Sequence, residues 1–76
     1  MKRYKFKGFI WVVNHRESGW IDLSIENKNY DPKDKTSRHY YGQGIFKDVE
    51  GMLQYIYNYH NLKEPITLED LEILED

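Results

Sequence analysis

The chain contains no cysteine, and its 76 residues include only two prolines and five glycines. The missing thiols exclude a disulfide framework, a thiolate zinc site and a cysteine nucleophile. No apolar run approaches the roughly 20 residues that a transmembrane helix requires, so we expect no contact with the membrane interior. No apolar stretch followed by small residues succeeds the basic N-terminus, so we expect no secretory signal and a cytoplasmic protein.

The chain has many aromatic side chains, which can stabilise a small core in the absence of disulfides and thiolate metal sites. Seven Tyr, three Phe and two Trp make up 16% of the residues, and each buries more apolar area than an average aliphatic side chain. A chain of this length lies near the lower limit for a self-supporting core. We therefore expect one compact domain over residues 1–76 whose core depends on its aromatic residues.

Charge is sorted along the sequence, although the formal net charge is only −2. Residues 1–13 hold four basic side chains and no acidic one, whereas residues 64–76 hold six acidic side chains and no basic one. Such sorting bears on how a protein meets its partners. The acidic segment predicts contact with a basic partner surface, and its candidate contact residues are Glu69, Asp70, Glu72, Glu75 and Asp76.

Three segments have the composition and alternation of β-strands, namely residues 4–13, 20–26 and 38–46. In the second segment, Ile21, Leu23 and Ile25 alternate with polar residues, which predicts a half-buried strand. Gly42 and Gly44 interrupt the third segment and indicate a bulge or a close backbone contact.

Residues 49–60 predict an amphipathic helix, because their apolar side chains recur at helical spacing after Asp48, a good N-cap residue. Asn61 suits the left-handed position that follows a helix. The acidic residues 67–75 fit either a short helix or a strand. The expected fold is therefore α+β: a three-stranded antiparallel sheet in the order β-β-β-α, one helix packed on one face, and a short acidic C-terminal helix or strand.

The register of the first two strands decides which side chains are exposed. If residues 14–19 form the connecting loop, Val13 faces Trp20 and Trp11 faces Asp22. The aliphatic side chains then share the core face, and both indoles point away from the helix. Contiguous exposed aromatic residues on a small protein mark an interface. This register therefore predicts Trp11 and Trp20 as apolar anchors for a partner.

The same face suggests two alternatives. Exposed aromatic rings beside cations suit weak binding of single-stranded nucleic acid, whose bases stack on rings while cations follow the phosphates. The candidate residues for this function are Lys5, Lys7, Phe9, Trp11 and Trp20. The expected register also pairs Lys7 with Glu26, which would remove one of those cations. The second alternative is a homodimer of unknown role, built by pairing the aromatic faces or the sheet edges.

No motif predicts catalysis, a cofactor or a metal site. His15, His39 and His60 match no metal-ligand spacing. Glu17 and Ser18 share a turn with His15, but a turn does not hold a nucleophile and a base in a fixed orientation.

We therefore expect a non-catalytic protein-binding module that acts by occupying the surface of a partner. The composition, rich in Lys, Ile, Asn and Tyr, is that of an AT-rich coding sequence. It suggests a phage or mobile-element accessory protein. An anti-CRISPR-like inhibitor of a host nucleic-acid-handling enzyme would be one example of this class.

Overall fold

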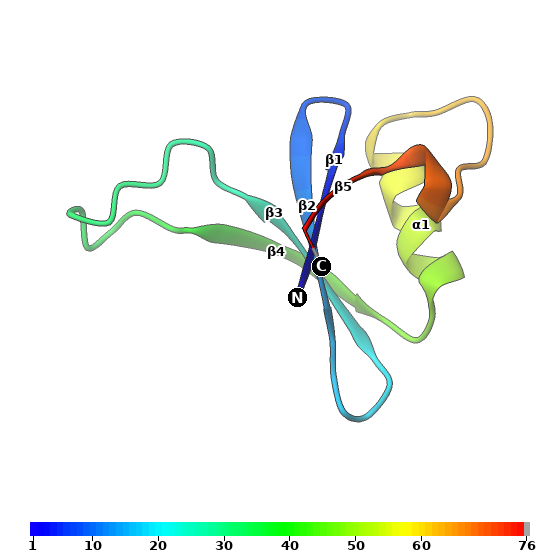
Figure 1. The fold of residues 1–76 in the computed structure, drawn as a ribbon, viewed down its shortest axis with the longest axis horizontal. Coiled ribbons are helices and arrows are strands. Elements are labelled where there is room, and N and C mark those ends of the chain that lie inside the picture. Colours follow the sequence, from blue (N-terminus) through cyan, green and yellow to red (C-terminus); the bar gives the residue numbers. More distant parts are fainter. Residues whose placement is uncertain (76) are drawn as a thin grey trace.

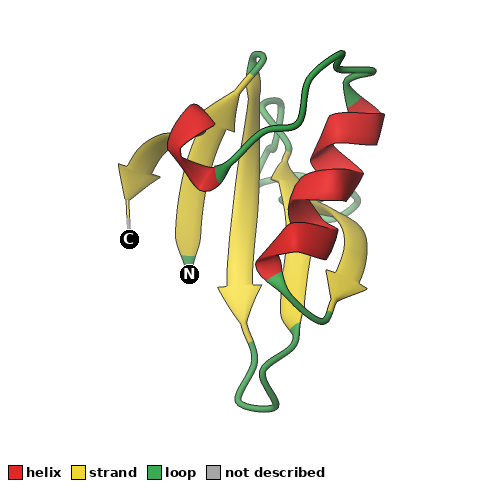
Figure 2. Cartoon of the chain, turned by 90° about the vertical axis from the view of Figure 1, so that its right-hand side faces the viewer, coloured by secondary structure: helices red, strands yellow, loops and turns green. Residues whose placement is uncertain are grey.

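A computed structural model describes residues 1–75 of the chain and the side chains of residues 1–74 (Figure 1). Its elements along the chain are β1 (Lys2–Phe6), β2 (Phe9–His15), β3 (Ile21–Glu26), β4 (Tyr40–Phe46), α1 (Val49–Tyr59), the single 3₁₀ turn η1 (Leu68–Asp70) and β5 (Glu72–Glu75). The strands form one antiparallel sheet in the spatial order β4-β3-β2-β1-β5. Helix α1 lies across one face of this sheet (Figure 2). The fold is therefore α+β.

The expected three-stranded sheet is wrong, because the sheet has five strands within the described residues. Residues 4–13 were expected to form one strand, but Lys7 and Gly8 make a two-residue turn inside that segment. Their φ angles are 51° and 80°, and two consecutive positive φ angles characterise the turn that joins tight hairpins. Strands β1 and β2 thus form a hairpin, with Phe6 opposite Phe9. The acidic C-terminal segment supplies the fifth strand, β5, beside β1.

The hairpin of β2 and β3 also has a register other than the expected one. Arg16 N–H donates to the Trp20 carbonyl at 2.8 Å, and Gly19 closes the three-residue turn with a φ of 96°. Trp11 lies opposite Ile25, three residues away from its expected partner. Because side chains alternate along a strand, a shift by an odd number moves each one to the other face. Trp11 consequently points toward α1.

Helix α1 begins where the sequence predicts and ends one residue earlier. The Asp48 carboxylate accepts the Gly51 N–H at 2.8 Å, as an N-cap residue does. After the helix, Asn61 has a φ of 51°, and Leu62 N–H donates to the Tyr57 carbonyl at 3.1 Å. These features match the expected left-handed end of the helix.

The core lies between the sheet and α1, and its largest fully buried side chains are Trp11, Leu23, Met52 and Ile56. Met52 and Ile56 belong to the predicted apolar stripe of the helix. The predicted bulge is confirmed, because the pairing of β3 with β4 shifts between Gly42 and Gly44.

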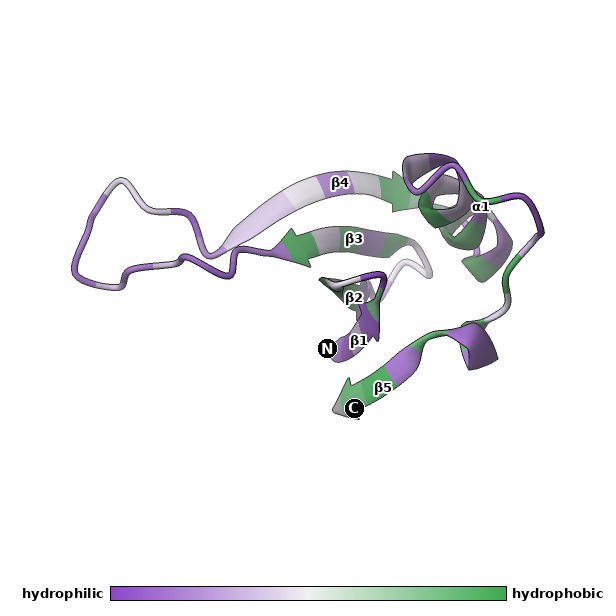
Figure 3. Cartoon of the chain, turned by 90° about the horizontal axis from the view of Figure 1, so that it is seen from above, coloured by the Kyte–Doolittle hydropathy of each residue, from purple (hydrophilic) through white to green (hydrophobic). Residues whose placement is uncertain are grey.

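Residues 27–39 connect β3 to β4 and extend away from the sheet, and we call them the arm (Figures 1 and 3). The C-terminal element contains both predicted alternatives, because the 3₁₀ turn η1 precedes strand β5. No helix in the described part of the chain is long and apolar enough to cross a membrane.

Candidate functional site

Trp11 lies in the core and has an exposed fraction of 0%. Its ring meets the rings of Tyr55, Tyr59 and His60 edge-on, at centroid distances of 6.3, 5.2 and 5.8 Å. The prediction that both indoles point away from the helix is therefore wrong for Trp11. A partner could contact Trp11 only if the helix left the sheet, so the structure removes this residue from any contact surface.

Trp20 is exposed, with 40% of the residue's surface accessible, and the Lys47 ammonium lies 6.0 Å from its ring centroid. The residues expected to bind nucleic acid together with Trp20 lie elsewhere. Lys7 sits in the turn at one end of β2, and Trp20 follows the turn at the other end. Phe9 is half-buried beside the end of α1. The structure does not gather this set of residues into one surface.

Pairing between β1 and β5 brings the basic and acidic ends of the chain together. Arg3 lies opposite Glu75, and Lys5 lies opposite Glu72. Arg3 also donates two hydrogen bonds to the Glu26 carboxylate, at 2.8 and 2.9 Å. Glu26 was expected to pair with Lys7 and pairs with Arg3 instead. Folding thus places part of the basic N-terminal charge beside part of the acidic C-terminal charge.

The other acidic residues predicted to contact a partner differ in whether their carboxylates are free to do so. The Asp70 carboxylate accepts the Thr67 N–H at 2.7 Å and therefore caps η1. Glu69 and Glu72 are exposed. Asp76 lies outside the described residues, as does the side chain of Glu75.

Apolar side chains accompany Glu69 and Glu72 along the C-terminal element, which we call the η1–β5 edge. Leu68 is 37% exposed, Ile73 60% and Leu74 39%. A groove of about 480 Å³ runs beside them, lined by Lys2, Tyr4, Leu68, Glu69, Leu71 and Ile73. Strand β5 is the last strand of the sheet, so its outer backbone groups pair with no strand in the described residues. This edge combines an unpaired strand, an apolar groove and carboxylates.

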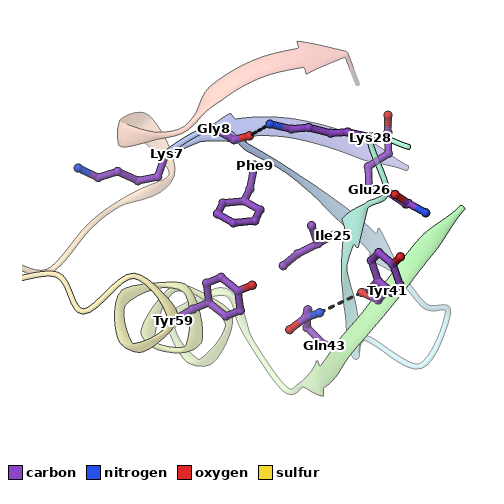
Figure 4. Close-up of a pocket in the computed structure, with 10 residues that line it drawn as sticks. Lys7, Gly8, Phe9, Ile25, Glu26, Lys28, Tyr41, Gln43 and Tyr59 are labelled. Carbon is purple, nitrogen blue, oxygen red and sulfur yellow. Dashed lines mark hydrogen bonds between the residues drawn. The ribbon is translucent and has the colours of Figure 1, made fainter. Parts of the chain in front are cut away.

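A second groove of about 590 Å³ lies near the other edge of the sheet, where the arm begins (Figure 4). We call it the aromatic groove. The β1–β2 turn, the end of β3, strand β4 and the last turn of α1 surround it, and its lining includes Phe9, Ile25, Lys28, Tyr41, Gln43 and Tyr59. Sequence reasoning named Lys7 and Phe9 but missed this site, because its residues are spread from position 7 to position 59 and meet only through the fold.

Polar groups at the aromatic groove are held by hydrogen bonds. The Lys28 ammonium donates to the Gly8 carbonyl, which ties the base of the arm to the β1–β2 turn. The Gln43 amide nitrogen donates to the Tyr41 carbonyl at 3.2 Å. The Gln43 amide oxygen accepts the Tyr55 hydroxyl at 2.6 Å. These groups therefore have defined positions before any ligand binds.

His60 packs among aromatic rings after the end of α1, at centroid distances of 5.3 Å from Phe6 and 5.4 Å from Phe9. Burial lowers the pKa of His60 from its ordinary value of 6.5, and the nearby Lys7 ammonium lowers it further. The imidazole is therefore mainly neutral near pH 7. Within the described part of the chain, no group of three or more His, Cys, Asp and Glu residues could hold a metal ion.

Comparison with known proteins finds no matching family model, no matching curated protein and no matching solved structure. The function is therefore inferred from the surfaces described above.

Proposed function

We propose that the protein is a small, non-catalytic protein-binding module and that the η1–β5 edge is its contact surface. The observation that carries this proposal is the exposure of Leu68, Ile73 and Leu74 beside an unpaired strand. Exposed apolar residues on an edge strand promote association and add little to the protein's own core. A partner that covers them accounts for their presence.

A partner segment in an extended conformation fits this edge. The outer N–H and C=O groups of β5 are available to an added antiparallel or parallel strand, which would extend the sheet. Alternate side chains of such a strand would point into the groove beside Tyr4, Leu68 and Leu71. Backbone pairing would supply affinity, and the groove would supply specificity.

The carboxylates of the edge favour a partner with basic residues. Glu69 forms no ion pair with any residue that the structure describes, whereas Glu72 faces Lys5 across the strands. Charges at the rim of an interface mainly set association rate and partner choice. An inhibitor that occupies the basic surface of a nucleic-acid-handling enzyme, encoded by a phage or mobile element, is one example of this class.

Selection of short random peptides on the immobilised protein, followed by calorimetry of individual peptides, tests the proposal. We expect selected peptides that alternate apolar residues with Lys or Arg. Leu68→Ser combined with Ile73→Ser should weaken their binding at least about tenfold, because the contacts of two apolar side chains are lost. The melting temperature should change little, since both side chains are exposed.

Ile45→Ser is the matched control, because Ile45 is a 48% exposed apolar residue on the opposite edge strand, β4. It should leave peptide binding unchanged. Glu69→Lys should reduce affinity for basic peptides, whereas Glu50→Lys on the exposed side of α1 should not. The proposal is wrong if no peptide is recovered, or if the double variant binds the recovered peptides as tightly as the parent.

A further inference from the structure

The aromatic groove and the arm form a second surface that the protein-binding proposal does not use. We propose that this surface binds single-stranded nucleic acid, with one base in the groove and the phosphate backbone along the arm. The ligand class follows from three features: aromatic walls around a narrow apolar floor, a fixed cation at the rim, and further cations without ion-pair partners on the arm.

The walls of the groove suit a flat aromatic ligand. Phe9 and Tyr59 stand on one side, Tyr41 stands on the other, and Ile25 lies between them on the floor (Figure 4). Tyr41 is 45% exposed and Tyr59 43% exposed, so their rings are open to a ligand. The volume of about 590 Å³ falls within the range usual for ligand sites. A nucleobase has the π-face that such rings stack on.

Polar groups at the groove match the rest of a nucleotide. The Lys28 ammonium uses one of its three N–H donors on the Gly8 carbonyl, which leaves two for a phosphate. The fixed Gln43 amide is placed to meet the polar edge of a base. Lys7 also lines the groove, but its ammonium points away from the centre and lies 5.9 Å from the Phe6 ring centroid. Lys28 is therefore the cation that faces the site. The Glu26 carboxylate also lines the groove, and it accepts two hydrogen bonds from Arg3.

The arm adds positive charge next to this site. Residues 27–39 hold four basic side chains and two carboxylates, a formal charge of +2 in a chain whose total is −2. Both carboxylates bind within the arm: Asp31 accepts the Lys33 N–H, and Asp34 accepts the Thr36 N–H, each at 2.9 Å. In the part of the chain that the structure describes, Lys33, Lys35 and Arg38 form no ion pair.

Internal contacts hold the arm in shape. The rings of Tyr30 and His39 stack at 4.4 Å with an interplanar angle of 10°, and His39 stacks on Tyr40 at 4.1 Å. Asn27 N–H donates to the His39 carbonyl, and the Asn27 amide donates to the Arg38 carbonyl at 2.6 Å. Cations on such a frame lose less entropy on binding than cations on a flexible loop.

An acidic protein is an alternative ligand for the cations of the arm. Its acidic side chains have no aromatic ring that would fill the space between Tyr41 and Tyr59. Paired strands hide the faces of their bases, so duplex nucleic acid also leaves that space empty. The acidic η1–β5 edge repels phosphates on the arm only weakly. The arm leaves the sheet between β3 and β4, and β5 is four strand spacings or about 19 Å from β4, whereas the Debye length at 0.1 M salt is about 10 Å.

Fluorescence anisotropy with a labelled oligothymidylate at low salt tests this proposal. We expect binding whose log affinity falls with log salt with a slope of about −2, as three phosphate contacts produce. Lys33→Glu with Lys35→Glu should weaken binding and flatten that slope. Tyr41→Ala should weaken binding about tenfold through lost stacking and leave the slope unchanged, whereas Tyr41→Phe should retain affinity.

Lys63→Glu and Trp20→Ala are matched controls, a cation and an exposed aromatic residue outside this surface, and both should bind as the parent does. Circular dichroism establishes whether each variant is folded. If Tyr41→Ala is unfolded, Lys28→Gln provides a second variant of the groove. Three results would each overturn the proposal. The parent protein would show no anisotropy change, or the folded Tyr41→Ala and Lys28→Gln variants would both bind as tightly as the parent. The third is displacement of the oligonucleotide by polyglutamate of equal charge. Peptide binding at the η1–β5 edge is unaffected by these changes, so the two proposals fail independently.

Discussion

Trp11 is the largest of the fully buried side chains and joins the sheet to the end of α1 through Tyr55, Tyr59 and His60. Its indole N–H is buried and has no hydrogen-bond partner among the described residues. An unpaired buried donor costs free energy. The ring therefore stabilises the fold by packing and offsets the cost of its own polar atom.

Trp11→Ala should lower the free energy of unfolding by about 3–5 kcal/mol, the usual cost of deleting a buried large aromatic side chain. A core of this size supplies on the order of 3–5 kcal/mol in total, so the variant should be largely unfolded at 25 °C. Urea titration followed by circular dichroism measures the change. Trp11→Phe should lose much less, because it keeps most of the packing and removes the unpaired N–H. A cooperative Trp11→Ala transition at the midpoint of the parent protein would show that the ring is not part of the core.

His60 makes the stability of the protein depend on pH. Burial and the Lys7 ammonium lower the pKa of His60 in the folded state below 6.5, so the unfolded chain binds a proton first on acidification. Stability from this residue is fully present above pH 6.5 and falls as the pH drops toward the lower folded-state pKa. Melting temperatures between about pH 7.5 and about pH 5.5, where histidine titrates, should therefore decrease.

His60→Gln should reduce that decrease, because glutamine does not titrate. His15→Gln is the matched control, since His15 is an exposed residue at the end of β2. Identical pH profiles for the parent and His60→Gln would show that the buried imidazole does not govern this dependence.

Capping decides where α1 begins. Asp48→Ala removes the side chain that accepts the Gly51 N–H and should lower the free energy of unfolding by about 1 kcal/mol. Glu50→Ala, at an exposed position in the first turn of the same helix, should change it by less than about 0.5 kcal/mol. Thermal or urea unfolding of the two variants gives the comparison, and equal stability of both would contradict the capping role of Asp48.

The two edge strands differ in a way that supports separate roles. Strand β5 is short and carries Glu72 beside exposed Ile73, whereas β4 has seven residues and no charged side chain. Charged residues limit unspecific pairing at a sheet edge, and the bulge between Gly42 and Gly44 distorts the β4 edge. These differences favour β5 over β4 as the edge at which a partner strand adds to the sheet.

At the scale of the whole molecule, folding redistributes the charge. The basic first strand lies against the acidic last strand, with Arg3 opposite Glu75 and Lys5 opposite Glu72, so the two ends of the chain do not form widely separated charged surfaces. The arm carries a further group of cations without ion pairs among the described residues, Lys33, Lys35 and Arg38, and the sequence marks it only as a long turn-rich segment. A sequence-based map of charge therefore overlooks the basic surface of the arm.

Local chemistry in the sequence was enough to place the helix, its Asp48 and Asn61 ends, the glycine bulge and strand β3, because caps, turns and periodicity act over a few neighbouring residues. The number of strands and the position of Trp11 were decided only by the tertiary structure. One turn inside residues 4–13 and a register set by a three-residue loop change which face the side chains of β2 occupy, because side chains alternate along a strand. Both grooves likewise exist only because residues distant in the sequence are brought together by strand pairing and by the packing of α1.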